Sequence, residues 1–504
     1  MTERATHPEH YRVAIIGTGF AGIGMAARLK RAGLKDLVLL ERANDIGGTW
    51  RDNTYPGATC DVPSNLYSLS FAPNPDWSRS FSGQPEIWDY LRRVAEDEDI
   101  VRHVKFDHDV EAARWDPEGN RWWLHTPHGV VTAQFLVSGC GALADPSIPD
   151  IPGLDKFEGT MFHSADWNHE HDLNGRNVAV VGTGASAIQF VPQIQPQVGH
   201  LHLFQRTPAW VIPRTDRNIS SVESWLYRNV PVTQQIARKG VYWMRENYIF
   251  GFVHSPKLMK GVAALSKAHM KRAVKDPELR AKLTPNYLPG CKRILLANDY
   301  YPSLAQPNVS VITDGVSEVR EKSVVSADGT EREVDTIIFG TGFHVTDLPI
   351  AQRIYDSEGV ALSERWGDNM QAHRGTTVKG YPNLFLLAGP NTGPGHTSQV
   401  FLIEAQINYA MAALRYACHN GVDRLSPRED AQDAYTRRVQ RKMKGTVWVT
   451  GGCDSWYLNS EGRNVTLWPG FSWEFALQNR KFDAGNYHLS SRSAARRNGV
   501  EVTA

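Results

Sequence analysis

The sequence predicts an α/β protein in which two β-α-β units are combined with a helical insertion. An apolar run, a glycine cluster, a helical pattern and a second apolar run follow one another at residues 11–42, and the same order returns near residue 178. From residue 216 to about residue 285 the pattern is helical, with few strand signals. Strands that alternate with helices are typical of parallel sheets covered by helices. The repeated unit therefore predicts two such sheets in one chain.

The composition is that of a globular protein. Of 504 residues, 41% are hydrophobic and 22% are charged, which is ordinary for folded domains. Fifty-five Lys and Arg stand against 54 Asp and Glu, a net charge of +1. No overall field therefore favours nucleic acid, and we expect no nucleic-acid partner. The polar N-terminus MTERATHPEH, and the lack of an apolar run of about 18 residues, argue against secretion and against a membrane span.

Cysteine and histidine usage predicts neither a disulfide nor a metal site. The cysteines are odd in number, far apart and without a C-x-x-C pair, so we expect no disulfide framework, no dithiol redox centre and a reducing, cytoplasmic location. The histidines of the segment HSADWNHEHD match no zinc-ligand spacing, so no metal is expected. The five cysteines are Cys60, Cys140, Cys291, Cys418 and Cys453.

The first glycine cluster has the spacing of a dinucleotide-binding turn. Gly17-x-Gly19-x-x-Gly22 follows a strand pattern and opens a helical one. Glycines permit the tight turn and let the backbone approach a pyrophosphate at the helix N-terminus. Glu41 closes the next strand, 24 positions after Gly17, where a carboxylate can accept hydrogen bonds from ribose hydroxyls. The first unit is thus predicted to bind a dinucleotide with a free ribose.

The second glycine cluster predicts a different nucleotide. Gly182-x-Gly184-x-x-Ala187 has the same spacing, but the residue 24 positions after Gly182 is Arg206. A cation at this place can grip a 2′-phosphate, which a carboxylate would repel. The second unit is therefore predicted to bind NADPH. One chain with a ribose-type site and an NADPH site indicates two Rossmann-like domains, one for FAD and one for NADP.

The remaining segments predict five parts. Short alternating runs at 104–136 indicate a small β-meander, and DTIIFGTGF at 335–343 indicates a buried strand where the first unit resumes. A long helix is expected from about residue 396 to residue 417, with its N-terminus directed at the flavin. The predicted parts are the FAD-binding domain (1–147), the NADP-binding domain (148–215), the helical insertion (216–288), the second NADP-binding part (289–333), and the second FAD-binding part with a C-terminal loop region (334–504).

Two motifs lie between the glycine clusters. Gly47-Gly48-Thr49-Trp50, continued by Tyr55-Pro56-Gly57 and Asp61, supplies glycines, an aromatic ring and a carboxylate suited to packing on a flavin. The i, i+4 spacing of His163 and Trp167 suits an ordinary helix face.

The scattered Lys and Arg of the helical insertion are interpreted as solvated surface, with membrane docking as the less favoured alternative.

Together these motifs resemble the type I Baeyer–Villiger monooxygenases, FAD- and NADPH-dependent enzymes that insert oxygen beside a ketone carbonyl. The resemblance extends over nearly the whole chain. It rests on both glycine clusters, F-x-G-x-x-x-H-x-x-x-W at 157–167, G-G-x-W-x-x-x-x-Y-P-G-x-x-x-D at 47–61, Cys291-Lys292-Arg293, the strand and turn at 335–342, and Ser455-Trp456-Tyr457.

The resemblance implies a set of site residues. Arg293 matches the family's active-site arginine, and Asp61 its partner carboxylate. The implied substrates are a small-molecule ketone and O₂, which react through a C4a-peroxyflavin to give an ester or lactone. His163 and Trp167 would belong to a linker that senses NADP. The implied cofactor-binding residues are Gly17, Gly19, Phe20, Gly22, Glu41, Gly48, Thr49, Trp50, Asp61, Tyr67, Val110, Gly182, Thr183, Gly184, Ser186, Ala187, Arg206, Thr207, Lys292, Arg293 and Trp456.

Arg293 and Asp61 suggest how the oxygen nucleophile is kept reactive. A guanidinium cannot lose its proton in a protein, so it would supply permanent positive charge beside the peroxyanion, and Asp61 would orient it. Two alternatives stay open. One is a flavin monooxygenase that oxidises amine nitrogen or sulfide sulfur, and the other is a flavoprotein that binds without catalysing.

Overall fold

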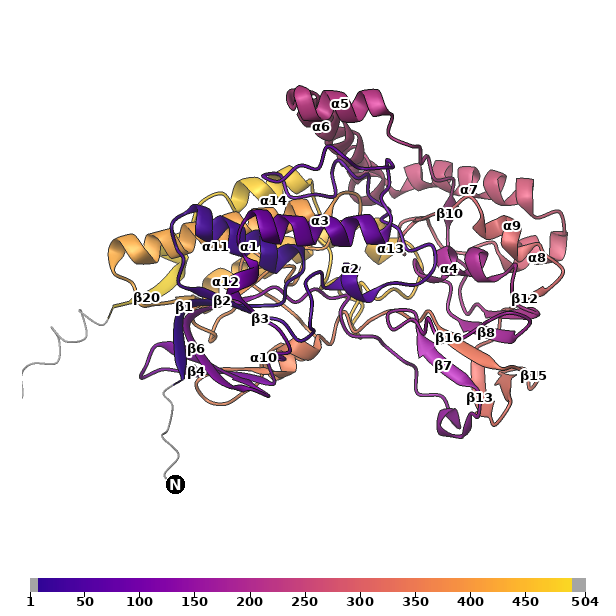
Figure 1. Cartoon of the computed structure of the whole chain (residues 1–504), viewed down its shortest axis with the longest axis horizontal. Coiled ribbons are helices and arrows are strands. Elements are labelled where there is room, and N and C mark those ends of the chain that lie inside the picture. Colours follow the sequence, from indigo (N-terminus) through magenta and orange to yellow (C-terminus); the bar gives the residue numbers. More distant parts are fainter. Residues whose placement is uncertain (1–7, 492–504) are drawn as a thin grey trace, which may run out of the picture.

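The computed structural model describes residues 8–491, and it has the α/β architecture that the sequence predicts. Two lobes, each built around a largely parallel sheet with helices on its faces, lie side by side, and a pair of helices projects above them (Figure 1). The polar residues 1–7, which carry most of the expected N-terminus, lie outside the described residues. Within 8–491, no helix is both long and apolar enough to cross a membrane.

The first lobe contains an eight-stranded sheet. Its central strand β1 (Glu9–Ile16) pairs in parallel with β2 (Leu37–Leu40) and with β6 (Gly129–Ser138). The predicted meander forms antiparallel strands that extend from β6, and α1 (Phe20–Arg31) packs on α11 (Gln399–Asn420). The sheet is completed by β3 (Val104–Lys105), β4 (Ala112–Asp116), β5 (Arg121–Thr126), β17 (Ile354–Tyr355) and β18 (Leu384–Leu386).

The second lobe contains a five-stranded parallel sheet in the order β12-β9-β8-β16-β7. Its strands are β7 (Thr160–His163), β8 (Asn177–Val181), β9 (His200–Phe204), β12 (Val309–Ile312) and β16 (Thr336–Phe339). Apolar side chains from both faces of this sheet are buried, because helices α4 (Ala187–Ile194) and α9 (Tyr300–Leu304) cover one face and a three-stranded sheet covers the other.

The second sheet corrects two expectations. β16, which lies in the segment DTIIFGTGF, pairs with β7 and β8, so the chain does not return to the first sheet at residue 334 but only at β17. Strand pairing is a tertiary property that a local pattern does not encode. His163 and Trp167 do not share a helix face either. His163 ends β7, and Trp167 lies in the loop after it, where its ring packs against that of Phe162 in β7.

The expected helical insertion is helical. It contains α5 (Ser221–Asn229), α6 (Val232–Glu246), a π-helical turn (Phe250–His254), α7 (Met259–Ala273) and α8 (Pro277–Lys282). A capping box starts α5, because the Ser220 hydroxyl accepts a hydrogen bond from Glu223 N while the Glu223 carboxylate accepts one from Ser220 N. The two-stranded parallel ribbon of β10 (Val211–Ile212) and β11 (Leu295–Leu296) joins the insertion to the second lobe.

Shorter elements complete the fold. The strands are β13 (Val316–Arg320), β14 (Ser323–Ser326), β15 (Glu331–Glu333), β19 (Arg424–Pro427) and β20 (Tyr487–Ser490). The helices are α2 (Thr49–Asp52), α3 (Gln84–Asp97), α10 (Leu362–Trp366), α12 (Glu429–Met443), α13 (Val447–Thr450) and α14 (Ser472–Gln478). Single 3₁₀ turns span Val101–His103, Leu154–Lys156, Pro256–Leu258, Pro349–Gln352 and Ala484–Asn486.

Candidate functional site

A cavity of about 1120 Å³ is lined by both glycine turns. Pockets for one drug-sized ligand measure roughly 300–1,000 Å³, so this one lies just above the upper end of that range. Of the residues that sequence reasoning put in the site, Gly22 and Ala187 are not among the lining residues. The others line it: Gly17, Gly19, Phe20, Glu41, Gly48, Thr49, Trp50, Asp61, Tyr67, Val110, Gly182, Thr183, Gly184, Ser186, Arg206, Thr207, Lys292, Arg293 and Trp456.

The first glycine turn needs glycine for two different reasons. Gly17 follows β1 with φ +91°, a left-handed conformation that other residues rarely adopt. A Cβ on Gly22 would lie 1.9 Å from the Gly17 carbonyl oxygen, so Gly22 allows α1 to start close against the turn. Gly22 therefore serves helix packing, while Gly17 and Gly19 present backbone to the cavity.

Glu41 holds the first turn in place. Its buried carboxylate follows β2, and one oxygen accepts hydrogen bonds from Thr18 N at 2.9 Å and Thr18 Oγ1 at 2.6 Å. The other oxygen accepts one from Arg51 Nη1 at 2.9 Å. The carboxylate thus lies at the carboxyl end of its strand and lines the cavity beside the turn, where ligands of such folds bind. Its contact with a ribose stays a prediction.

The second turn has two cations beside it. Gly182, with φ +109°, could not carry a Cβ, which would lie 2.4 Å from the Gly340 carbonyl oxygen. Arg206 follows β9 and is exposed to the cavity, and Lys292 lines the same region. Burial, together with the charge of Arg206, lowers the pKa of Lys292. Within residues 8–491 neither cation forms a salt bridge, so an anion bound between them would relieve their repulsion.

Asp61 and Arg293 form an ion pair on the cavity wall. Arg293 donates through Nε to Asp61 Oδ2 at 2.5 Å and through Nη2 to Asp61 Oδ1 at 2.6 Å. Burial would raise the pKa of Asp61, but Arg293, Arg245 and Arg214 hold it below its ordinary value. The charge of Asp61 raises the pKa of Arg293. With 35% and 25% of their side chains exposed, Arg293 and Asp61 remain open to the cavity.

Sequence reasoning missed two arginines that hold Asp61. Arg245, at the end of α6, donates to the Asp61 carbonyl oxygen at 2.7 Å. Arg214 donates to the Cys60 carbonyl oxygen at 2.6 Å and to Thr59 Oγ1 at 3.0 Å. The Asp61 loop is thus clamped from outside the first lobe. No local motif could have revealed these arginines, because their partners lie more than 150 positions away in the sequence.

The C-terminal loop reaches Arg293 through Tyr457. Tyr457 and Trp456 line the cavity, with their ring centroids 4.3 Å apart. Burial raises the pKa of Tyr457 to about 12, although Arg293 opposes this shift. Trp456 is 48% exposed, and Tyr457 is buried. The loop therefore covers the pair from one side.

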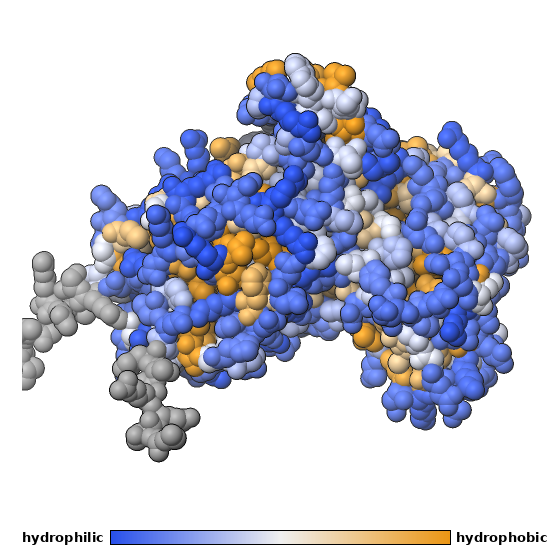
Figure 2. All heavy atoms as spheres, in the orientation of Figure 1, coloured by the Kyte–Doolittle hydropathy of each residue, from blue (hydrophilic) through white to orange (hydrophobic). Residues whose placement is uncertain are grey.

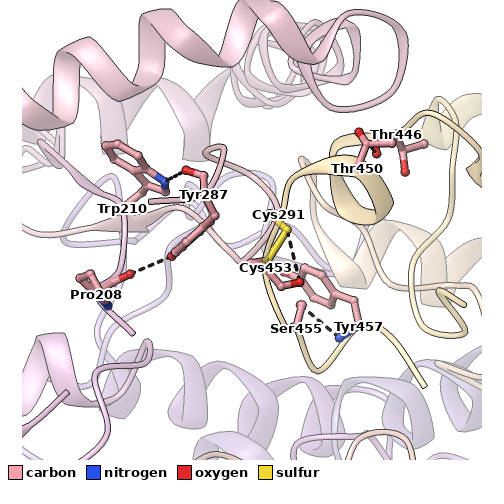
Figure 3. Close-up of a disulfide and its surroundings, with 9 residues drawn as sticks. All are labelled: Pro208, Trp210, Tyr287, Cys291, Thr446, Thr450, Cys453, Ser455 and Tyr457. Atoms are coloured by element: carbon pink, nitrogen blue, oxygen red, sulfur yellow. Dashed lines mark hydrogen bonds between the residues drawn. A yellow bond between two sulfur atoms is a disulfide. The ribbon is translucent and has the colours of Figure 1, made fainter. Parts of the chain in front are cut away.

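A disulfide joins this loop to the segment before Arg293. Cys291 and Cys453 are bonded across 162 positions of the sequence, with their Cα atoms 6.2 Å apart (Figure 3). The expectation of no disulfide is therefore wrong at this pair, because spacing along the chain does not reveal proximity in the fold. Cys60, Cys140 and Cys418 are free. The disulfide sits beside Trp210 and Tyr287, which pack with Cys291.

The segment before α11 offers unpaired polar atoms to the cavity. The helix begins at Gln399, with Ser398 before it, three residues later than the sequence suggests. Thr397 Oγ1 and Gln399 Nε2 are buried without a partner in the described structure, and both residues line the cavity. Most buried polar groups in proteins have a hydrogen-bond partner, and these two atoms, which face the cavity, fit a polar group such as a flavin ring. That the helix N-terminus faces a flavin stays a prediction.

The 157–167 motif lies outside the cavity lining. Trp167 is buried, with its ring centroid 5.1 Å from that of Phe162 and 5.3 Å from that of Phe190. His163 accepts a hydrogen bond at Nδ1 from Ala165 N at 3.1 Å, while its buried Nε2 has no partner in the described structure. The contacts shown are packing contacts, so the role of these residues in sensing NADP stays a prediction.

Comparison with known proteins gives consistent matches. Residues 10–353 match the flavin-binding monooxygenase-like family. A Baeyer–Villiger monooxygenase of Streptomyces coelicolor is 52% identical over 97% of this chain and 94% of its own length. Cyclohexanone monooxygenase from Rhodococcus sp. Phi1, solved with NADP⁺, is 27% identical, with a TM-score of 0.84 over 96% of this chain and all of that one. The complex of OTEMO with FAD and NADP is 25% identical, with a TM-score of 0.84 and the same coverage.

Proposed function

Because this chain belongs to the flavin-binding monooxygenase-like family and matches Baeyer–Villiger members over nearly its whole length, we propose that it oxidises a ketone to an ester or lactone with NADPH and O₂. The observation that carries the proposal is a paired Asp61 and Arg293 on the wall of a cavity that both nucleotide turns also line. FAD and NADPH are the cofactors. When bound, flavin reduced by NADPH would supply the two electrons with which one oxygen atom of O₂ is inserted beside the carbonyl while the other leaves as water.

The second lobe holds NADPH by charge. Arg206 and Lys292 provide two cations that have no salt-bridge partner in the described structure, and they are placed to bind a 2′-phosphate. The Thr183 hydroxyl donates to the Thr207 carbonyl oxygen at 3.2 Å and so fixes the start of the segment after Arg206. Backbone N–H groups of the second glycine turn would receive the pyrophosphate.

The first lobe holds FAD by shape and by unsatisfied polar atoms. Gly17, Gly19 and Gly48 leave backbone at the cavity surface, and Thr397 and Gln399 offer unpaired polar atoms to a flavin ring. The Trp50 indole donates to Tyr67 Oη at 3.1 Å, which fixes both rings at the cavity wall.

Arg293 stabilises negative charge at the reacting centre. Its guanidinium stays protonated at every working pH, so it offers fixed donors to an oxyanion formed when the ketone carbonyl is attacked. Asp61 orients the guanidinium through two parallel hydrogen bonds. Tyr457 and Trp456 cover the pair and help to exclude water, which favours electrostatic stabilisation.

The two sheets also support a division of the chain. We place the NADP-binding unit in 148–215 and 289 to about 339, so that β16 stays with its sheet, and the FAD-binding unit in the flanking parts. We place the protein in the cytoplasm. Three free cysteines support a reducing compartment, whereas the Cys291–Cys453 disulfide argues against one.

The test is turnover of purified, flavin-loaded protein with linear, cyclic and aryl ketones. We expect ketone-stimulated NADPH oxidation, one ester or lactone formed for each NADPH and each O₂ consumed, and much slower oxidation with NADH. A sulfide and a tertiary amine are assayed in parallel. Oxidation of the sulfide or amine without any ester from any ketone would replace this proposal with nitrogen or sulfur oxidation. NADPH oxidation that no ketone stimulates would contradict it as well.

A further inference from the structure

Exposed apolar side chains are concentrated on the helical insertion. Within residues 8–491, eleven of the nineteen large hydrophobic side chains that are exposed lie between residues 222 and 265. A monomer rarely gathers so many in one place unless the surface meets a partner. The eleven are Val222, Trp225, Val230, Val232, Ile236, Trp243, Met244, Tyr248, Phe250, Leu258 and Leu265. We call this set the insertion patch.

Helix α6 is amphipathic, but it turns polar side chains toward the first lobe. A surface helix normally turns its apolar stripe toward the protein. The polar stripe of α6 faces inward instead, where its side chains donate to the first lobe and are partly or fully buried. Gln234 donates to the Asn74 carbonyl oxygen, Arg238 to the Ser68 carbonyl oxygen and Arg245 to the Asp61 carbonyl oxygen.

The apolar stripe of α6 faces outward. Its members are spaced at i, i+4, i+11 and i+12, which places them on one side of the helix. They are Val232, Ile236, Trp243 and Met244, which are 53%, 64%, 56% and 50% exposed. The neighbouring helix α5 adds Val222 and Trp225, 66% and 57% exposed. Figure 2 shows apolar residues at the tip of the projecting helices, which Figure 1 labels α5 and α6.

The charge of the insertion identifies the chemistry of the partner. Residues 221–282 contain twelve Lys and Arg and four Asp and Glu, although the whole chain has 55 and 54. The insertion is thus strongly basic and the rest of the chain is acidic. The exposed lysines of the insertion include Lys239, Lys257, Lys260, Lys267 and Lys271. Helix α7, which carries three of them, lies along the same edge of the molecule as α5 and α6 (Figure 1).

We propose that the insertion patch docks on the surface of an anionic phospholipid bilayer. Trp225 on α5 and Trp243 on α6, together with exposed aliphatic side chains and with exposed lysines in the same insertion, suit the boundary between headgroups and acyl chains. The lysines suit anionic headgroups. A second copy is a poorer partner, because joining two insertion patches would bring two strongly basic surfaces together. The patch lies apart from the cavity lining, and the inference does not depend on the proposed function.

Flotation of the purified holoenzyme with large unilamellar vesicles tests the proposal. One vesicle preparation contains equal amounts of phosphatidylcholine and phosphatidylglycerol, and the other contains phosphatidylcholine alone. At 0.1 M NaCl we expect at least tenfold more protein to float with the anionic vesicles, and 0.5 M NaCl to weaken the capture because salt screens surface charge. Equal capture by both vesicle types, or no capture by either, would overturn the proposal.

Variants assign the binding to the patch. Trp225→Ser combined with Trp243→Ser removes two exposed rings, and we expect at least a tenfold loss of capture. Val101→Ser combined with Met161→Ser removes exposed side chains outside the insertion, 39% and 38% exposed, and serves as the matched control with native capture. Lys267→Glu combined with Lys271→Glu should abolish the preference for anionic vesicles. Flavin content and ketone turnover in solution monitor folding and should stay at the native level in all three.

The same variants decide between a bilayer and another copy of the chain. Sedimentation velocity without lipid should give the same species for the native protein and the tryptophan variant. A native dimer that dissociates in the tryptophan variant would assign the patch to self-association and overturn the proposal. Unchanged capture of the tryptophan variant by anionic vesicles would also overturn it, because binding would then come from charge elsewhere.

Discussion

The guanidinium of Arg293 faces the cavity while Asp61 holds it by two hydrogen bonds. Arg293→Ala removes a fixed positive charge from the place where an oxyanion develops, and such a loss typically costs about 10²–10³ in rate. We expect ester formation to fall by that factor, while reduction of the flavin by NADPH in stopped flow continues at a near-native rate. Arg365→Ala breaks a comparable pair with Asp356 that does not line the cavity, and should leave turnover unchanged. Near-native ester formation by Arg293→Ala would contradict the assigned role.

Arg206 is expected to decide which nicotinamide cofactor is used. Its side chain lines the cavity beside Lys292 and forms no salt bridge in the described structure. A hydrogen bond to a charged group contributes about 1.5–3 kcal/mol, so Arg206→Ala should raise the KM for NADPH by roughly 10–100-fold. The KM for NADH, which has no 2′-phosphate, should barely change and serves as the internal control. An equal loss with both cofactors would mean that Arg206 only supports the fold.

Helix α6 joins the helical insertion to the pair of Asp61 and Arg293. Arg245, at its end, donates to the carbonyl oxygen of Asp61 and adds a positive charge that helps to lower the pKa of that carboxyl. Removing the charge should therefore raise the pKa of Asp61. Arg245→Gln should lower kcat and move the acid limb of the pH profile of kcat to higher pH.

The shift of the acid limb distinguishes an effect of Arg245 on Asp61 from a general loss of structure. Lys239→Gln, on the exposed side of the same helix, removes a charge without touching Asp61 and should leave the profile in place. Arg245→Lys keeps the charge and should restore the acid limb even where kcat stays low. A lower kcat with an unmoved limb would assign Arg245 to folding alone.

The elements also show what a sequence can predict here. The glycine turns, the meander and the insertion were predictable, because each is marked by a local period or a turn residue. The sheet that contains β16, the disulfide between Cys291 and Cys453, and the contact of Arg245 with Asp61 were not predictable. Each depends on segments that are distant in the chain and meet only after folding. Most charged residues and glycines that the sequence singles out line the cavity, and the arginines that hold Asp61 and its loop were missed.

The candidate site exists only where distant parts of the chain meet. Asp61 comes from the first lobe, Arg206 and Lys292 from the second, and Trp456 from the C-terminal loop. The disulfide ties that loop to the segment before Lys292. A local disturbance in either lobe is therefore expected to affect oxygen transfer even when each cofactor still binds.

The end of the described chain is anchored to the first lobe by Asp483. Its Oδ2 accepts a hydrogen bond from Arg374 Nε and lies against His373 Nε2, each at 3.0 Å, and its Oδ1 accepts one from the Tyr409 hydroxyl. Burial would raise the pKa of Asp483, but these partners hold it well below its ordinary value. Because the folded-state pKa is depressed, this carboxylate stabilises the fold above the unfolded-state pKa of about 3.9, and its contribution is lost as the pH falls below that value.

Asp483→Asn should therefore destabilise the protein at pH 7 and weaken its acid sensitivity. Breaking a fully buried pair by removing one charge costs at least about 3 kcal/mol, and this pair, with 18% and 19% of its side chains exposed, should lose less when Arg374 is left without its carboxylate. We expect the Tm of the variant to fall by several degrees at pH 7, and its deficit relative to the native protein to shrink as the pH is lowered from 5 toward 3. Asp430→Asn, which breaks an exposed pair with Arg428, should change Tm little at either pH. A deficit that stays constant with pH would mean that the Asp483 charge does not supply the stability, and packing of the C-terminal segment alone would then hold it to the first lobe.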